Sequence, residues 1–262
     1  MSASSEATPL LEVRNLVRHF RAGGRRLFGK SQTVHAVDGV NFHLHDGETL
    51  GLVGESGCGK STTGKLVIGI DTPTSGEVLF QNRPVANLKI DDWRKLRCDI
   101  QMIFQDPSGS LDPRIAIGTQ IREPLDIHGI GSPAERDAKV DEMLKAVNLP
   151  EAARDRFPHE LSGGQQQRVV IARALMLEPK LIVCDEPVSA LDVSVQAQVV
   201  NLLSALQKRL GLAYLFISHD LGIVRHICQR VAVMYLGEIV ETADRFALFN
   251  RPLHPYSQSL IA

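Results

Sequence analysis

The chain contains four short apolar runs, of which the first ends in glycine and the second in an acid. They are ETLGLVG at 48–54, LIVCD at 181–185, LAYLFIS at 212–218 and VAVMYL at 231–236. Runs this short and this continuously apolar are typical of strands that are buried on both faces of a sheet. Stretches with helical spacing lie at 60–70, 163–177, 193–209 and 220–228. This alternation predicts an α/β fold with a parallel sheet that is covered by helices on both faces.

Four other segments have a strand-like pattern, at 10–20, 34–44, 75–85 and 100–104. The character of the chain changes between 106 and 160, where six prolines accompany the helix-like stretch PAERDAKVDEMLKAVNL. Prolines at this density break long strands, and the apolar spacing of the stretch is that of a helix. The pattern therefore predicts a mainly helical insertion at 106–160.

The composition narrows the class of protein. Hydrophobic residues make up 44% of the chain and charged residues 23%, which is ordinary for a globular protein. The net charge of −1 argues against a global electrostatic attraction to nucleic acid. No apolar stretch approaches the roughly 18 residues that a membrane-spanning helix needs. The four cysteines are scattered and form no CxxC pair, which fits a reducing cytosol better than a disulfide framework.

Residues 54–61 read GESGCGKS and match the pattern GxxxxGK[ST] directly after a predicted strand and at the start of a predicted helix. Glycines let successive N–H groups face one point, and the positive end of the following helix adds to this anion site. We expect Lys60 to neutralise the β- and γ-phosphates of a nucleotide, Ser61 to supply a hydroxyl to Mg²⁺, and Thr62 to reach the α-phosphate. The candidate nucleotide-binding residues of this loop are Gly54, Glu55, Ser56, Gly57, Cys58, Gly59, Lys60, Ser61 and Thr62.

Two adjacent acids, Asp185 and Glu186, end the apolar strand at 181–185. In a parallel sheet, ligands bind outside the carboxyl ends of the strands, where this pair is placed. Asp185 is suited to hold Mg²⁺ directly or through water. Glu186 is suited to orient and polarise the water that attacks the γ-phosphorus.

A second glycine-lined helix start occurs at 161–165, which reads LSGGQ. Ser162, Gly163, Gly164 and Gln165 open the predicted helix and form a second anion site. One bound nucleotide in one chain needs only one such site. A second site, far along the chain, is explained if it contacts the nucleotide that a partner chain holds.

With these motifs in this order, the chain resembles the ATP-binding subunits of ABC transporters over nearly its whole length. The resemblance implies that Gln105, in IFQDP, contacts Mg²⁺ and water and senses the γ-phosphate. It implies that 189–192, SALD, is the loop that crosses the dimer interface. His219, in FISHD, corresponds to the histidine that contacts the γ-phosphate and holds the geometry of the attacking water.

The same resemblance implies a single ABC ATPase domain over 1–262. Its fold class is an α/β P-loop NTPase cassette with a parallel sheet core, an antiparallel β subdomain and a helical subdomain. Residues 9–105 and 161–262 would form the catalytic core with the N-terminal β subdomain, and 106–160 the helical insertion. The implied substrate and metal are ATP and Mg²⁺.

The roles of one phenylalanine and of one pair of histidines have alternative interpretations. Family members stack adenine on an aromatic residue ahead of the phosphate loop, and Phe20 is the best candidate; the alternative is a buried core phenylalanine. His43 and His45 alternate on one face of a predicted strand. Without further ligands, this pair does not indicate a metal site.

Several stretches resemble the peptide/nickel branch of importer ATPases, among them 101–114, 185–203, 216–227, 233–241 and 254–260. That branch imports di- and oligopeptides, nickel, glutathione or related small solutes. The resemblance implies pairing with a second ABC ATPase subunit, as a heterodimer or alternatively a homodimer, beneath two transmembrane permease subunits. An extracytoplasmic solute-binding protein would deliver the solute, and nucleic acid is not an expected partner. The expected location is peripheral, on the cytoplasmic face of the inner membrane.

Two other functions are compatible with an ABC-type cassette. The first is an ATPase that acts on nucleic acid or the ribosome, which usually carries a tandem cassette or a coiled coil. The second is a non-hydrolysing, nucleotide-gated scaffold, against which the presence of Lys60, Gln105, Asp185, Glu186 and His219 argues.

Overall fold

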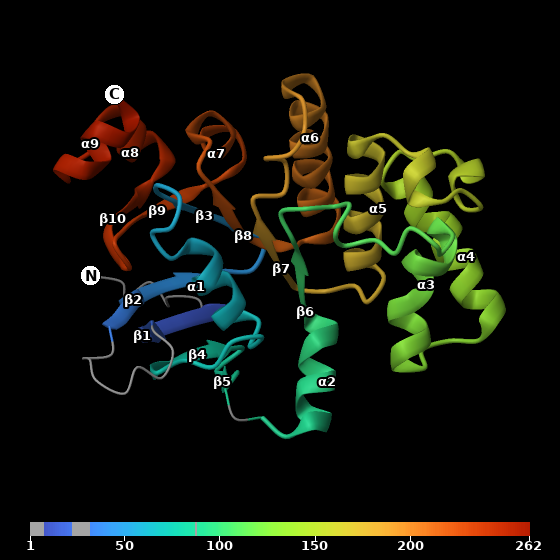
Figure 1. Ribbon diagram of the computed structural model, residues 1–262, viewed down its shortest axis with the longest axis horizontal. Helices are drawn as coiled ribbons and strands as arrows, with labels where there is room; N and C mark the ends of the chain where they lie inside the picture. Colours follow the sequence, from blue (N-terminus) through green and yellow to red (C-terminus); the bar gives the residue numbers. More distant parts are fainter. Residues whose placement is uncertain (1–7, 23–31, 87) are drawn as a thin grey trace, which may run out of the picture. The chain divides into compact units, whose positions relative to one another are not determined.

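The structure is a computed structural model that describes residues 8–22, 32–86 and 88–262. The chain divides into two compact units. Figure 1 labels their helices and strands. The first comprises Met1–Lys89 and Leu215–Ala262, and the second comprises Ile90–Tyr214.

The first unit contains an antiparallel sheet with the strand order β2-β1-β4-β5. Its strands are β1 (Leu11–Ala22), β2 (Gln32–Leu44), β4 (Ser75–Phe80) and β5 (Arg83–Pro84). Side chains alternate along β1 and β2, so that Leu11, Val13, Leu16, Val40 and Phe42 are buried while their neighbours are more exposed. One face of this sheet therefore packs on a core, as period-two patterning predicts.

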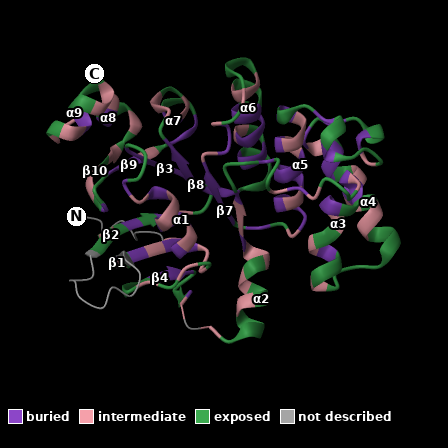
Figure 2. Ribbon diagram, viewed as in Figure 1, coloured by how far each residue is buried: buried purple, intermediate pink, exposed green. Residues whose placement is uncertain are grey.

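The same unit contains parallel strands with a helix after them. β3 (Thr49–Val53) pairs in parallel with β9 (Arg230–Tyr235), which pairs antiparallel with β10 (Glu238–Asp244). The helices of the unit are α1 (Lys60–Val67), α7 (Leu221–Ile227), α8 (Arg245–Asn250) and α9 (Pro255–Ile261). Every residue of β3 is buried (Figure 2), as the apolar run predicted.

The second unit is mainly helical around a parallel strand pair, β6 (Ile100–Ile103) and β7 (Leu181–Asp185). Its helices are α2 (Ile90–Asp99), α3 (Ile117–His128), α4 (Pro133–Ala146), α5 (Gly163–Leu175) and α6 (Val193–Leu210), with two 3-10 turns at Glu151–Ala153 and Pro158–Glu160. Strand β8 (Ala213–Ser218), buried throughout, crosses the sequence boundary between the two units.

Parallel pairs, an antiparallel sheet and helices confirm the predicted α/β fold class. The predicted boundaries of the helical insertion, 106–160, stay a prediction; that range holds α3, α4 and the two 3-10 turns. Helix α1 ends at Val67 rather than at 70, because the chain turns at Gly69, where φ is +64°.

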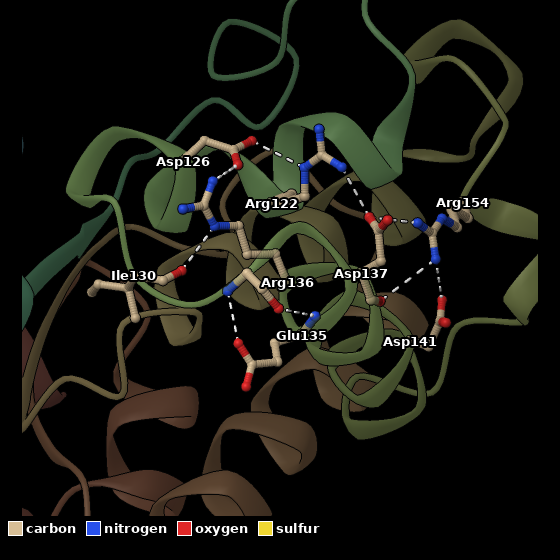
Figure 3. A network of polar contacts seen from close by, with 9 residues as sticks. Arg122, Asp126, Ile130, Glu135, Arg136, Asp137, Asp141 and Arg154 are labelled. Carbon is tan, nitrogen blue, oxygen red and sulfur yellow. Dashed lines mark hydrogen bonds and ion pairs between the residues drawn. The ribbon is translucent and has the colours of Figure 1, made fainter.

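Ion pairs connect α3, α4 and the turn that follows them in the second unit (Figure 3). Arg122 on α3 contacts Asp137 on α4 at 2.9 Å, and Arg154 contacts the same carboxylate at 2.7 Å. The network consists of Arg122, Asp126, Arg136, Asp137, Asp141 and Arg154. The hydrogen bond from Arg136 lowers the pKa of Asp126. One carboxylate shared by two arginines ties α3, α4 and the following turn together.

Candidate functional site

The loop at 54–61 joins the buried strand β3 to α1 and is held from two sides by backbone. A Cβ atom at Gly54 would lie 2.2 Å from the carbonyl oxygen of Met234, and one at Gly59 would lie 2.1 Å from that of Ala36. Gly54, Gly57 and Gly59 also have φ values of +152°, +83° and +113°. The glycine spacing therefore follows from close backbone approach and from left-handed backbone, which side chains disfavour. The result is a curled loop at the N-terminus of a helix.

Lys60 places a cation inside this loop. Its side chain is buried, with 4% of the residue exposed, and its Nζ donates to the carbonyl oxygens of Gly54 at 2.7 Å and Glu55 at 2.8 Å. A buried ammonium needs such partners to offset the loss of water. The chain thus holds a preorganised positive charge against a glycine cradle, which is an arrangement that fits a polyphosphate.

A C-terminal tyrosine contacts the same loop. The backbone N–H of Glu55 donates to the hydroxyl oxygen of Tyr256 at 3.0 Å, and the ring of Tyr256 lies 4.3 Å from that of Tyr235, between centroids. Burial raises the pKa of the Tyr256 hydroxyl. Tyr256 is the second residue of α9, and the backbone before this helix is anchored because the N–H of His254 donates to Glu241 at 2.9 Å. Sequence reasoning missed this residue, because nothing local in HPYSQSL indicates a contact 201 positions away.

We expect Tyr256→Phe to raise the KM for ATP about fivefold, with a smaller effect on kcat. The loss of one hydrogen-bond acceptor for a loop N–H is worth about 1 kcal/mol. Steady-state ATPase measurements over a range of ATP concentrations test this.

Tyr235→Phe is the matched control, because it also removes one tyrosine hydroxyl but keeps a ring against Tyr256. An unchanged KM in Tyr256→Phe, or an equal rise in Tyr235→Phe, would contradict a role of the Tyr256 hydroxyl in positioning the loop.

In the second unit, the predicted carboxylate pair ends β7. Asp185 is 5% exposed, and Glu186 follows with φ of +47°. The Nε2 atom of Gln105, just after β6, donates to Oε2 of Glu186 at 3.1 Å. Because β6 and β7 are parallel neighbours, their carboxyl ends lie at the same edge, which explains why residues 81 positions apart meet. The structure thus brings together Gln105 and Glu186, two of the predicted catalytic residues.

The segment at 161–165 is a well-capped helix start. The Oγ atom of Ser162 accepts from the N–H of Gln165 at 3.4 Å, and Oε1 of Gln165 accepts from the N–H of Ser162 at 3.0 Å. A Cβ atom at Gly164 would lie 2.4 Å from Cγ1 of Val195, so α6 packs directly on this turn. Ser162 and Gly163 are exposed. The start of this 13-residue helix is therefore exposed at Ser162 and Gly163 and packed against α6 at Gly164.

A side-chain hydrogen bond links this helix start to the segment after Gln105. The hydroxyl of Ser108 donates to Oε1 of Gln166 at 2.8 Å, and Nε2 of Gln166 donates to the carbonyl oxygen of Pro158 at 2.8 Å. If the segment after Gln105 moved, these two hydrogen bonds would transmit the movement to Gln166 and to the turn that precedes α5.

Phe20 and His219, two residues of the first unit, are both exposed. Phe20 is 36% exposed, with the Arg18 guanidinium 4.5 Å above its ring centroid. The alternative of a buried core phenylalanine is therefore wrong, while the adenine-stacking role stays a prediction. His219 follows the buried strand β8, and the next residue, Asp220, caps α7 by accepting from the N–H of Ile223 at 3.1 Å.

Within the described residues, none of the helices is both long enough and apolar enough to span a membrane.

The chain is similar to known proteins over most of its length. A family model described as "ABC transporter" matches residues 37–189. The chain is 50% identical, over 100% of its length and 80% of the relative, to the oligopeptide transport ATP-binding protein AppF of Bacillus subtilis (strain 168). It is 52% identical, over 97% of its length and 77% of the relative, to the oligopeptide transport ATP-binding protein OppF of Escherichia coli (strain K12).

The fold is also similar to those of solved proteins. The chain matches a dimeric ATP-binding cassette in a post-hydrolysis state, bound to ADP and Pi, with a TM-score of 0.79, 31% identity and coverage of 90% of this chain and 98% of the other. It matches the cbiO1 protein of Clostridium perfringens, part of an ABC transporter complex, with a TM-score of 0.79, 31% identity and coverage of 93% and 91%.

Proposed function

Because the chain belongs to the ABC transporter family, we propose that it is the ATP-hydrolysing subunit of an importer for di- or oligopeptides. The observation that carries this is the 50% identity with AppF, which extends over the whole chain and 80% of that protein. The proposal also depends on the intact set of motifs from the phosphate loop to His219.

In this proposal, the phosphate loop binds the nucleotide. Close-packed glycines and the buried Nζ atom of Lys60 fit the β- and γ-phosphates of ATP. We assign Ser61, Gln105 and Asp185 to Mg²⁺, whose oxygen preference matches their hydroxyl, amide and carboxylate groups. When bound, the ion neutralises charge that develops on the phosphoryl oxygens.

Hydrolysis needs a group that orients water, and Glu186 is the group we assign. Its carboxylate is half-buried, follows a rigid buried strand and accepts a hydrogen bond from Gln105. We propose that Gln105 holds this carboxylate, that Glu186 takes the proton of the attacking water, and that His219 contacts the γ-phosphate. A carboxylate placed by a fixed strand end loses little entropy when it acts.

We infer the need for a partner ATPase subunit from the second glycine-lined helix start. We propose that Ser162, Gly163, Gly164 and Gln165 contact the ATP held by a partner ATPase, which is a second ATPase subunit or another copy of this chain. The exposure of Ser162 and Gly163 and the positive end of α5 support this. Each nucleotide would then bridge two subunits, and hydrolysis would release them.

We further propose that the assembly lies on the cytoplasmic face of the inner membrane, beneath two permease subunits. The segment 106–114, which follows Gln105, would transmit closure to the permeases. The Ser108–Gln166 hydrogen bond supports this, because it connects that segment to the start of α5.

The direct test is the ATPase rate of the complete transporter in lipid vesicles. We expect peptide-loaded binding protein to raise the rate above that with peptide-free binding protein, while DNA and ribosomes have no effect. Stimulation by DNA or ribosomes, without stimulation by peptide, would favour the nucleic-acid alternative. A complex that binds ATP without hydrolysing it would favour the scaffold alternative.

A further inference from the structure

Three metal-ligating side chains meet on the antiparallel sheet of the first unit. Nε2 of His19, on β1, lies 3.2 Å from Oδ1 of Asp38, and Nδ1 of His35, on β2, lies 2.9 Å from Oδ2 of the same carboxylate. Each of the three residues offers one ligand atom, and these three atoms lie within 4.8 Å of one another. They are the only group of this kind among the described residues.

The sheet register creates this cluster. His19 and His35 are directly opposite each other in the β1–β2 ladder, and their rings stack with centroids 3.9 Å apart. Directly opposed residues of an antiparallel pair have neighbouring side chains, so two imidazoles are held together by the backbone. Asp38 follows on the same strand and turns its carboxylate toward both rings.

The ligand types and their spacing are compatible with a transition-metal cation. Zinc takes imidazole nitrogen and carboxylate oxygen at about 2.0–2.2 Å, so neighbouring ligands of a tetrahedral site are about 3.4 Å apart. The two nitrogen–oxygen distances here are 3.2 Å to Oδ1 and 2.9 Å to Oδ2, and with one ligand atom from each residue the three atoms lie within 4.8 Å of one another. Small side-chain rotations would therefore bring two nitrogens and one oxygen to that spacing. We propose that His19, His35 and Asp38 form a site for one divalent transition-metal ion, with zinc as the best fit, and with the fourth position open to water.

The other histidine pair on β2 gives a contrast. The rings of His43 and His45 lie edge to face with centroids 5.1 Å apart, and the pair belongs to no group of three ligands within the described residues. Two imidazoles without a third ligand bind zinc weakly, so His43 and His45 serve as an internal control.

Backbone contacts connect the strand that carries His35 and Asp38 to the phosphate loop. Ala36, between His35 and Asp38 in sequence, has its carbonyl oxygen 2.1 Å from where a Cβ of Gly59 would be. The N–H of Asp38 donates to the carbonyl oxygen of Gly237 at 2.8 Å, and the N–H of Gly237 donates to that of Cys58 at 2.9 Å. An ion that fixes His35 and Asp38 therefore also fixes the strand on which the loop packs. Since coupling is reciprocal, metal occupancy and loop order favour each other.

The test is a zinc titration of the nucleotide-free, full-length chain in a Cys98→Ser background. This background removes a pair of metal ligands that would compete for zinc, because Sγ of Cys98 lies 3.3 Å from Nδ1 of His128. We expect one ion per chain, and at least about tenfold weaker binding in His19→Ala and in His35→Gln. The double variant His43→Ala/His45→Ala should bind as the parent does. Cobalt in place of zinc should show the visible absorption of a tetrahedral site in the parent and lose it in His35→Gln.

Two results would overturn the proposal: equal binding by the parent and His35→Gln, or a loss of binding only in the His43→Ala/His45→Ala variant. His35 is exposed, so His35→Gln separates a ligand effect from misfolding, which thermal unfolding of each variant also checks. Hydrogen exchange without nucleotide tests the coupling. We expect zinc to slow exchange at 54–60 in the parent alone; bound zinc without this change would overturn the coupling to the phosphate loop.

Discussion

Glu186→Gln is expected to lower steady-state ATP turnover about 10²- to 10⁴-fold while ATP binding is retained. The amide occupies the same place at the end of β7 but is a far weaker proton acceptor. It can still hydrogen-bond to Gln105, whose Nε2 lies 3.1 Å from the carboxylate. Loss of the general base without loss of the site should therefore trap an ATP-filled, closed assembly. Turnover assays and nucleotide-retention measurements on the assembled transporter check this.

Glu178→Gln is the matched control for that prediction. Glu178 is also a glutamate of the second unit with positive φ, +52°, but its carboxylate pairs with Lys139 at 2.8 Å. We expect turnover in this variant to equal that of the parent. Turnover in Glu186→Gln within about twofold of the parent would show that the general base has been assigned to the wrong residue.

Lys60→Ala is expected to weaken ATP binding by about 10- to 150-fold, which corresponds to the 1.5–3 kcal/mol of a hydrogen bond to a charged group. Lys60 supplies the buried cation of the phosphate loop, and its Nζ also satisfies the carbonyl oxygens of Gly54 and Glu55. Its removal therefore takes away both the charge that faces the phosphates and two contacts that shape the loop. Equilibrium binding of a fluorescent ATP analogue measures the change.

The control is Lys65→Ala, which removes a lysine from the last turn of the same helix. We expect ATP affinity to stay within about twofold of the parent, because the phosphate loop lies at the opposite end of α1. If Lys60→Ala bound ATP as tightly as Lys65→Ala, the cation of the loop would have no part in nucleotide binding.

The apolar runs predicted the central strands because burial on both faces leaves little room for polar residues. β3, β7 and β8 are buried at every position and match their predicted ranges closely. β10 was missed for the opposite reason. It reads EIVETAD, has no fully buried residue, and is recognisable only through the turn at Leu236 and Gly237, where φ is +47° and +93°.

The phosphate loop could be predicted from sequence, because its chemistry is local. Glycines, lysine and hydroxyl residues follow one another, and their spacing alone defines the loop. The contact of Gln105 with Glu186 was not predictable from spacing, since it depends on β6 and β7 being neighbours. Tyr256 and the His19–His35 pair depend in the same way on packing and register.

The most direct test of the account is the structure of the ATP-loaded Glu186→Gln assembly. We predict that Ser162 and the N–H groups at the start of α5 contact the γ-phosphate of the ATP that a neighbouring ATPase subunit holds. If that helix start instead faced water, with the nucleotide bound within one subunit only, the proposed sharing of ATP between subunits would be wrong.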